Sequence, residues 1–218
     1  MPAYRTTRLT ALPDTHRGET VFVVHGFGGS RLMMAVLCNR LAQHGFDVCN
    51  WEYPSLSQGV PRIAAMLRNE LTAARCQTGS RPIHVVAYSM GAVVARTAFL
   101  EMDLTDWSGR LVMLGPPNHG SPLARFGGRI LRRWPVSIPD LSDQTGSFVR
   151  CLPAGPLPPT GIIAARFDHL VPVKNTRLDG VLEHRVINTI HKGLVFNREV
   201  SGLLSRFLES GSFAADRI

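Results

Sequence analysis

The 218-residue sequence has no run of 18 apolar residues, the least that a membrane-spanning helix requires, so we expect no such helix. Its start, Met-Pro-Ala-Tyr-Arg-Thr-Thr-Arg, lacks the apolar core of a secretory signal peptide. We therefore expect a cytoplasmic location. Internal repeats and low-complexity segments are also missing, and the length, with 44% hydrophobic residues, suits a single domain with a sizeable core.

Cysteine is scarce, and its spacing excludes the common paired sites. None of the four residues forms a C-x-x-C pair, and they are scattered over predicted helices, a strand and a loop. We expect free, buried thiols rather than a zinc site or a disulfide. The four are Cys38, Cys49, Cys76 and Cys151.

Lysine is nearly absent, since only Lys174 and Lys192 stand among 24 basic residues in a chain of net charge +8. Basic proteins attract nucleic acids and anionic membranes. The arginines are dispersed and no nucleic-acid-binding motif is present, so no nucleic-acid partner is expected. Two interpretations remain: an arginine-rich composition bias, which we favour, and peripheral contact with an anionic membrane surface. The sequence does not indicate an oligomeric state.

Apolar strand-like runs alternate with helical patterns along the chain. This alternation predicts an α/β fold with a mostly parallel sheet of about six strands and helices on both faces. The first 17 residues form either a short extra strand or an arm. Strands are expected near 20–24, 46–50, 83–87, 110–114, 161–165 and 185–189, and helices near 30–43, 60–76, 91–102 and 194–208.

Residues 87–91, Ala-Tyr-Ser-Met-Gly, join an apolar strand to a helix of small residues, with Ser89 at the sharp turn. This is the pattern of a nucleophile elbow. The turn is crowded, so small residues are needed at both ends, and Ala87 and Gly91 supply them. The backbone N–H of Met90 lies at a helix N-terminus, where it can stabilise an oxyanion.

Glycines also follow the first buried strand, in the run His25-Gly-Phe-Gly-Gly, which permits close backbone approach to a ligand. Ser30 is placed to cap the next helix. We interpret His25 as a hydrogen-bonding brace of this loop rather than a proton shuttle.

An acid and a base follow the last two predicted strands. Asp168 comes after strand 161–165 and can orient a histidine, with Asp179 and Asp143 as alternatives. His191 comes after strand 185–189 and is placed to reach Ser89. His184 precedes that strand and should lie at its wrong end. The other histidines are assigned to structural or surface positions: His16, His44, His84, His119 and His169.

The order Ser89, Asp168, His191 is that of the α/β-hydrolases. Over residues 18–209 the chain resembles these enzymes, and among them the small bacterial triacylglycerol lipases and related esterases. The resemblance rests on Leu-Gly-Pro-Pro-Asn-His-Gly-Ser-Pro-Leu-Ala at 114–124, on the segment 140–152 and on His-Lys-Gly-Leu-Val-Phe-Asn at 191–197. GPI inositol-deacylase-like proteins carry a similar signature. The chain departs from the pattern at Ala87, at Pro116 and at the Arg-Phe pair before Asp168.

The resemblance implies an α/β-hydrolase fold and a serine hydrolase of lipid or acyl esters, with a catalytic triad of Ser89, Asp168 and His191. It implies that the backbone N–H of Phe27 joins that of Met90 in an oxyanion hole. No metal or organic cofactor is implied. Three alternatives stay open: an acyl thioesterase, an acyltransferase with the same residues, and a non-catalytic binding module.

The segment 121–160 is expected to distinguish this chain from its relatives, and a short cap or lid is one interpretation of it. Apolar and basic residues alternate within it at near-helical spacing. The segment is either a lid that lies on a lipid interface or a surface helix that packs on the domain, which we favour. The residues concerned are Arg125, Phe126, Arg129, Ile130, Leu131, Arg132, Arg133 and Trp134.

Overall fold

The computed structural model describes residues 6–11, 15–125 and 136–214. In this part of the chain seven strands form one sheet in the order β1-β3-β2-β4-β5-β6-β7. Neighbouring strands are parallel except that β1 runs antiparallel to β3. The strands are β1 (Thr7–Leu9), β2 (Thr20–Val24), β3 (Asp47–Trp51), β4 (Ile83–Tyr88), β5 (Leu111–Leu114), β6 (Thr160–Ala165) and β7 (Glu183–Ile187).

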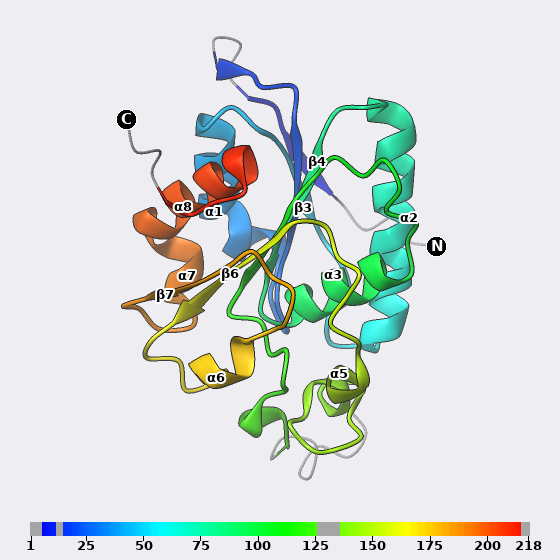
Figure 1. Cartoon of the computed structure of the whole chain (residues 1–218), viewed down its shortest axis with the longest axis vertical. Helices are drawn as coiled ribbons and strands as arrows, with labels where there is room; N and C mark the ends of the chain where they lie inside the picture. Colours follow the sequence, from blue (N-terminus) through cyan, green and yellow to red (C-terminus); the bar gives the residue numbers. More distant parts are fainter. Residues whose placement is uncertain (1–5, 12–14, 126–135, 215–218) are drawn as a thin grey trace.

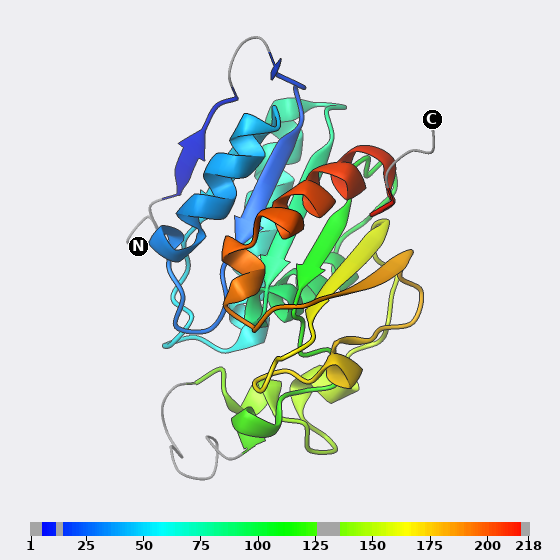
Figure 2. The ribbon, with the colours of Figure 1, turned by 90° about the vertical axis from the view of Figure 1, so that its left-hand side faces the viewer.

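Helices cover both faces of this sheet (Figures 1 and 2). On one face α2 and α3 enclose one apolar core, and on the other α1, α7 and α8 enclose a second. Strands covered on both faces have no side that must be polar, so β4 and β6 are buried along their whole length. The helical segments are α1 (Arg31–Gln43), α2 (Val60–Thr78), α3 (Met90–Leu100), η2 (Pro139–Leu141), α5 (Phe148–Cys151), α6 (Val173–Thr176), α7 (Gly193–Phe196) and α8 (Arg198–Ser210).

The fold class and the order of elements agree with the sequence prediction. The sheet has seven strands because the N-terminal segment forms β1, the extra strand that was one of its two expected outcomes. Three expectations are corrected. The strand expected at 185–189 lies two residues earlier, so His184 is inside β7. The helix expected at 194–208 is two helices, separated at Asn197, whose backbone is extended. Ser30 is the residue before α1, but its side chain makes no capping hydrogen bond.

All four cysteine thiols are free, and Cys38 and Cys49 are buried as expected. Cys76 and Cys151 are exposed, which corrects the expectation for these two. No helix in the described ranges is both long and apolar enough to span a membrane. Much of the expected lid sequence lies outside the described residues, namely Phe126, Arg129, Ile130, Leu131, Arg132, Arg133 and Trp134.

Candidate active site

Ser89 occupies a sharp turn between β4 and α3. Its backbone has φ 53° and ψ −122°, a left-handed conformation that is strained for a residue with a side chain. The turn brings β2 against the start of α3, since a Cβ atom on Gly91 would lie 2.3 Å from the carbonyl oxygen of His25. Glycine is therefore required at position 91 by space, and the strained turn lifts the Ser89 side chain away from the sheet.

His191 and Asp168 meet Ser89 in a chain of hydrogen bonds. The Nε2 atom of His191 lies 2.9 Å from Oγ of Ser89, and its Nδ1 atom lies 2.5 Å from Oδ2 of Asp168. A carboxylate only accepts, so Nδ1 carries the proton and Nε2 is left to accept from the serine hydroxyl. This is the tautomer that a general base needs.

The carboxylate of Asp168 is itself held in place. Its second oxygen, Oδ1, accepts hydrogen bonds from the backbone N–H groups of Leu170 and Val171, at 2.9 and 2.8 Å. Both Asp168 and His191 are buried, so water competes little with the bond between them. The loops after β6 and β7 thus deliver the acid and the base to the same end of the sheet, because parallel strands share their carboxyl edge.

Two backbone N–H groups near Ser89, those of Met90 and Phe27, have no acceptor among the described residues. Met90 is the first residue of α3, so its N–H has no partner within the helix. The N–H of Phe27 donates to no acceptor among the described residues. A Cβ atom on Gly26 would lie 3.0 Å from Cβ of Ser89, so this loop abuts the elbow directly. An anion formed at a substrate of Ser89 would find both donors nearby.

His25 braces this loop. Its Nδ1 atom lies 2.8 Å from the carbonyl oxygen of Gly26, and its ring stacks on Tyr53 at 4.0 Å between centroids. The hydroxyl of Tyr53 donates to the carbonyl oxygen of His25. Burial lowers the pKa of His25, which keeps the ring neutral. The sequence indicated the brace but not Tyr53, which comes from beyond β3.

A second network joins α3 to the loops above the sheet. Arg96 of α3 donates to the carbonyl oxygens of Leu152 and Pro153, both at 2.8 Å, and to Oδ1 of Asn118 at 3.3 Å. Asn118 in turn donates to the carbonyl oxygen of Thr176 at 2.9 Å. These bonds join the segment after β5 to the end of α6 and to the residues that follow α5. Sequence analysis missed Arg96, which looks like any arginine on a helix.

The alternative acids and histidines lie elsewhere. Asp143 pairs with Arg125 at 3.5 Å, and no contact of Asp179 with His191 is found in the described ranges. His184 shares a hydrogen bond with the Thr176 hydroxyl at 2.8 Å. Nδ1 of His119 lies 3.0 Å from the Arg150 guanidinium. The pKa of His119 is lowered mainly by partial burial and to a lesser extent by the positive charge of Arg150.

An apolar cavity of about 210 Å³ opens beside Ser89 and His191. Apolar residues of the segments after β5 and β6 and around η2 form most of its wall. Such a wall suits a hydrocarbon chain or ring rather than a charged group. The wall residues are Phe27, Pro117, Leu123, Ala124, Ile138, Leu141, Leu170 and Val171. No group of three or more His, Cys, Asp or Glu in the described residues is placed to hold a metal ion.

The chain matches no protein-family model and no curated protein. Solved structures do match, although their sequences differ widely. Lipase BlEst2 of Bacillus licheniformis, in its mature form, is 17% identical over 95% of this chain and 98% of that chain, with a TM-score of 0.71. The fold is that of the α/β-hydrolases.

Two further solved structures with the α/β-hydrolase fold match the chain. The Pyrococcus furiosus esterase Pf2001 is 19% identical over 95% of this chain and 92% of that chain, with a TM-score of 0.65. Aspergillus fumigatus lipase B is 17% identical over 97% of this chain and 58% of that chain, with a TM-score of 0.73. The α/β-hydrolase fold hosts many reactions, so chemistry has to follow from the residues at the site.

Proposed function

We propose that the chain is a serine hydrolase of carboxylic esters of the lipid or acyl class. The observation that carries the proposal is the hydrogen-bonded series Ser89, His191, Asp168 beside an apolar cavity. The known lipases and esterases of similar fold are consistent with it. No metal or organic cofactor enters this mechanism.

In the first half-reaction, His191 takes the proton from Oγ of Ser89 as this oxygen attacks the ester carbonyl carbon. The backbone N–H groups of Phe27 and Met90 donate to the oxyanion, worth about 3 kcal/mol each by comparison with known oxyanion holes. The carbon–oxygen bond to the alcohol then breaks, and His191 returns the proton to the leaving alkoxide. Ser89 is left acylated.

In the second half-reaction, His191 deprotonates a water molecule that attacks the acyl-enzyme. The acid leaves, and Ser89 regains its proton. Asp168 keeps His191 in the required tautomer and stabilises the imidazolium that forms twice in the cycle. The acyl part of the substrate occupies the apolar cavity, so a hydrocarbon acyl group is preferred over a charged one.

The test is hydrolysis of p-nitrophenyl esters of increasing chain length. Ser89→Ala should abolish turnover, and Asp168→Asn should lower kcat by about 10³–10⁴-fold because the wrong tautomer is then favoured. Asp179→Asn is the matched control and should leave kcat unchanged. A folded wild-type protein that neither turns over any ester nor reacts with a fluorophosphonate at Ser89 would favour the non-catalytic binding module.

The same residues would serve a thioesterase or an acyltransferase. A higher kcat/KM for an acyl thioester than for the matching oxyester would identify the first. Formation of a new ester when an alcohol is added would identify the second.

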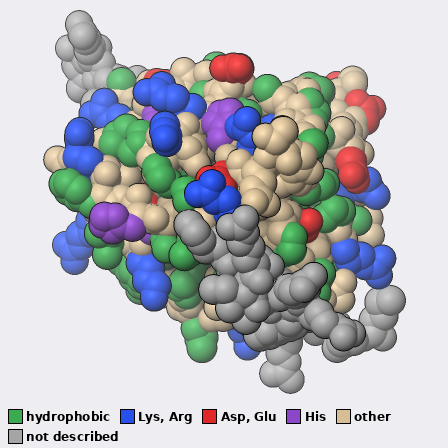
Figure 3. All heavy atoms as spheres, turned by 90° about the horizontal axis from the view of Figure 1, so that it is seen from below, with side chains coloured by type: hydrophobic (Ala, Val, Ile, Leu, Met, Phe, Trp, Pro, Cys, Tyr) green, Lys and Arg blue, Asp and Glu red, His purple; other side chains and the backbone are tan. Residues whose placement is uncertain are grey.

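We also propose that the protein binds peripherally to an anionic membrane surface and takes its substrate there. Six of the exposed large apolar side chains lie in or next to the loops at the carboxyl edge of the sheet, around the cavity. We call them the apolar rim; they are Phe27, Leu123, Val136, Phe167, Leu170 and Ile190. On the face that carries α5 and α6, apolar and basic side chains lie interspersed among other residues, a few of them acidic (Figure 3).

The charges beside Phe167, Leu170 and Ile190 of the rim favour an anionic surface. In the segments 161–178 and 184–198 the only acid is Asp168, which is buried against His191, whereas Arg166, Lys174 and Lys192 are exposed. Cations beside apolar side chains bind anionic lipids at the level of the head groups.

Flotation with phosphatidylglycerol-containing vesicles tests this docking. Ile190→Ser should reduce binding, while Leu182→Ser should not, because both side chains are 58% exposed but flank β7 at opposite ends. Added salt should also weaken binding. Equal binding of the two variants would contradict docking through the apolar rim.

A further inference from the structure

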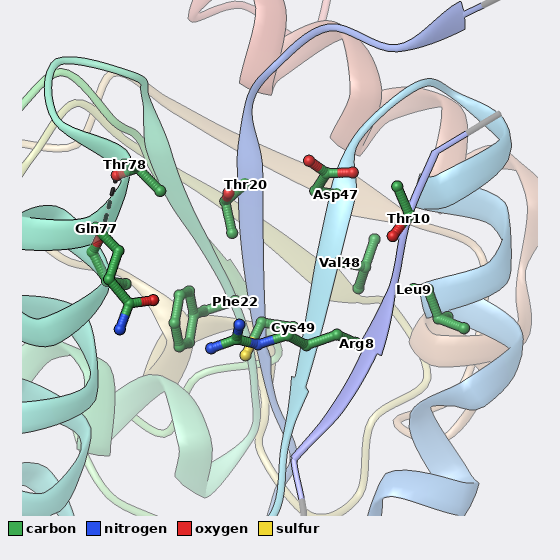
Figure 4. Close-up of a pocket in the computed structure, with 11 residues that line it drawn as sticks. Arg8, Leu9, Thr10, Thr20, Phe22, Asp47, Val48, Cys49, Gln77 and Thr78 are labelled. Carbon is green, nitrogen blue, oxygen red and sulfur yellow. Dashed lines mark hydrogen bonds between the residues drawn. The ribbon is translucent and has the colours of Figure 1, made fainter. Parts of the chain in front are cut away.

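A second hollow lies far from Ser89, at the edge of the sheet where β1 pairs with β3. Its volume is about 190 Å³, and it is enclosed by β1, β2, β3 and the last turns of α2 (Figure 4). The hollow is at the amino ends of β2 and β3, whereas Ser89 follows the carboxyl end of β4. None of the residues at the candidate active site lines it.

The pairing register explains why these residues meet. Arg8 stands opposite Cys49, and Cys49 stands opposite Phe22, so the three side chains form one row across β1, β3 and β2 on a single face. On this face α2 packs with α3, and α1 covers the opposite side of β1 and β3. Helix α2 therefore does not cover the whole row of side chains. A hollow is left between the strands and the last turns of α2.

The floor of the hollow is apolar and uncharged. Phe22 and Cys49 are nearly fully buried, and Ala74 of α2 forms part of the wall. Burial raises the pKa of the Cys49 thiol to about 12, so it stays protonated and does not repel an anion. A floor of this kind accepts a hydrocarbon group.

The rim of the hollow offers two polar side chains that have no partner among the described residues. Arg8 extends over Cys49 toward Phe22, and Gln77 points from α2 toward the same ring (Figure 4). Neither side chain makes a hydrogen bond or ion pair with a described residue. The acid at this rim, Asp47, is already engaged by the backbone N–H of Ala11 at 3.2 Å and by His16 at 2.9 Å.

We propose that this hollow binds a small organic monocarboxylate. The carboxylate accepts hydrogen bonds from the guanidinium of Arg8 and the amide of Gln77, and the hydrocarbon part lies on Phe22 and Cys49. A guanidinium fork matches the two oxygens of a carboxylate. Among the described residues that line the hollow, Arg8 is the only cation, and the acids Asp47 and Glu70 lie near it, since the charge of Glu70 acts on the pKa of Cys49. This balance suits a monoanion better than a phosphate dianion. A volume of about 190 Å³ suits a small ring or a short chain.

The proposal does not depend on ester hydrolysis, and its test needs no turnover. The probe is 4-fluorobenzoate, whose ¹⁹F resonance broadens when it binds to the full-length protein. The neutral 4-fluorobenzamide has the same shape without the charge, and inorganic phosphate has charge without an apolar body. We expect broadening with the benzoate, little with the amide, and no competition from phosphate.

Variants locate the binding. Arg8→Gln should weaken 4-fluorobenzoate binding at least about tenfold, which corresponds to loss of one charge-assisted contact. Ala74→Leu should weaken it by filling the hollow, and it keeps a good helix former in α2. Arg62→Gln is the control, because it removes the same charge from the exposed start of α2. Unfolding curves establish that each variant is folded.

Several results would overturn the proposal. Absence of broadening with the wild type would do so directly. Equal broadening in the wild type and Arg8→Gln would place the carboxylate elsewhere, for example near Ser89. Equal binding of the benzamide would exclude recognition of the anion, and displacement by phosphate at similar concentration would exclude the apolar floor as a determinant.

Discussion

The strained backbone conformation of Ser89 depends on a glycine two residues later in the chain, Gly91. Conformations of this kind cost about 1–3 kcal/mol and persist only where the surroundings enforce them. Here the enforcement comes from backbone packing, because Gly91 approaches the carbonyl oxygens of His25 and Val24 so closely that a Cβ atom would lie 2.3 and 2.7 Å from them. The elbow and the loop that carries Phe27 are thus one unit.

We predict that Gly91→Ala separates this unit. The methyl group would displace the end of β2 or the start of α3, so the free energy of unfolding should fall by about 2–4 kcal/mol. The loop with Phe27 would move away from Ser89, and kcat for ester hydrolysis should fall by roughly tenfold or more. Urea unfolding and esterase kinetics on the purified variant measure the two effects.

The matched control is Gly202→Ala. This glycine lies inside α8, and the nearest atom to an added Cβ would be Nη1 of Arg206, at 3.8 Å. Alanine is the better helix former, so stability should rise by up to about 1 kcal/mol. Similar stability changes at positions 91 and 202 would refute close backbone approach as the reason for Gly91.

The site residues differ in whether they could be predicted from the sequence. Ser89 could be predicted because strand, turn and helix are contiguous, and Asp168 and His191 because each follows a buried strand. Tyr53 and Arg96 could not, since they act on partners 28 and 56 residues away and no local pattern marks such bonds.

The helices illustrate a related limit, because their N-termini are capped in three different ways. The side chain of Asn197 accepts from the N–H of Glu199 at 2.8 Å and so begins α8. At α2 the capping position is Gly59, and Asp140 from the distant η2 segment accepts from the N–H of Val60 at 2.8 Å. Ser30 precedes α1 without capping it, and Glu52 accepts from the N–H of Arg31 instead.

We predict that Asn197→Ala destabilises the protein by about 1 kcal/mol, the usual cost of losing an N-cap side chain. Ser30→Ala should change stability by no more than a few tenths of a kcal/mol, since its hydroxyl makes no such bond. Urea unfolding of both variants provides the comparison. An equal loss in the two would mean that residue type, rather than the observed bond, sets the contribution.

The break at Asn197 explains why one helix was predicted where two exist. The residues on both sides of it are apolar at helical spacing, so periodicity runs through the break. The helix is interrupted at Asn197, whose backbone is extended and whose side chain caps the next turn. Because asparagine also occurs inside helices, the residue type alone does not predict this break. The displaced start of β7 has a similar cause, because its first residues are polar.

At the scale of the whole molecule, alternation of strands and helices was sufficient to predict the layers. It left open whether the first 17 residues form an extra strand or an arm, because Thr7–Leu9 has only three residues and no apolar run. That strand exists through its pairing with β3, which is a tertiary interaction. The hollow beside Arg8 was unpredictable for the same reason, since it depends on the register of three strands.

Histidines with lowered pKa values predict that the whole protein loses stability in mild acid. Burial lowers the pKa values of His25 and His184, and partial burial with a nearby arginine lowers that of His119. The unfolded chain, with ordinary histidines of pKa about 6.5, then binds protons that the folded chain does not. Stability is therefore complete above pH 6.5 and declines as the pH falls through that value.

Urea unfolding at pH 7.5, 6.5 and 5.5 measures this decline. The fully buried His25 should contribute most of the decline between pH 6.5 and 5.5, because burial holds its pKa below that of an unfolded histidine. His25→Gln should lower stability at every pH, because the stack on Tyr53 is lost, yet flatten the slope between pH 6.5 and 5.5. A slope as steep as that of the wild type would mean that His25 takes up its proton in the folded protein.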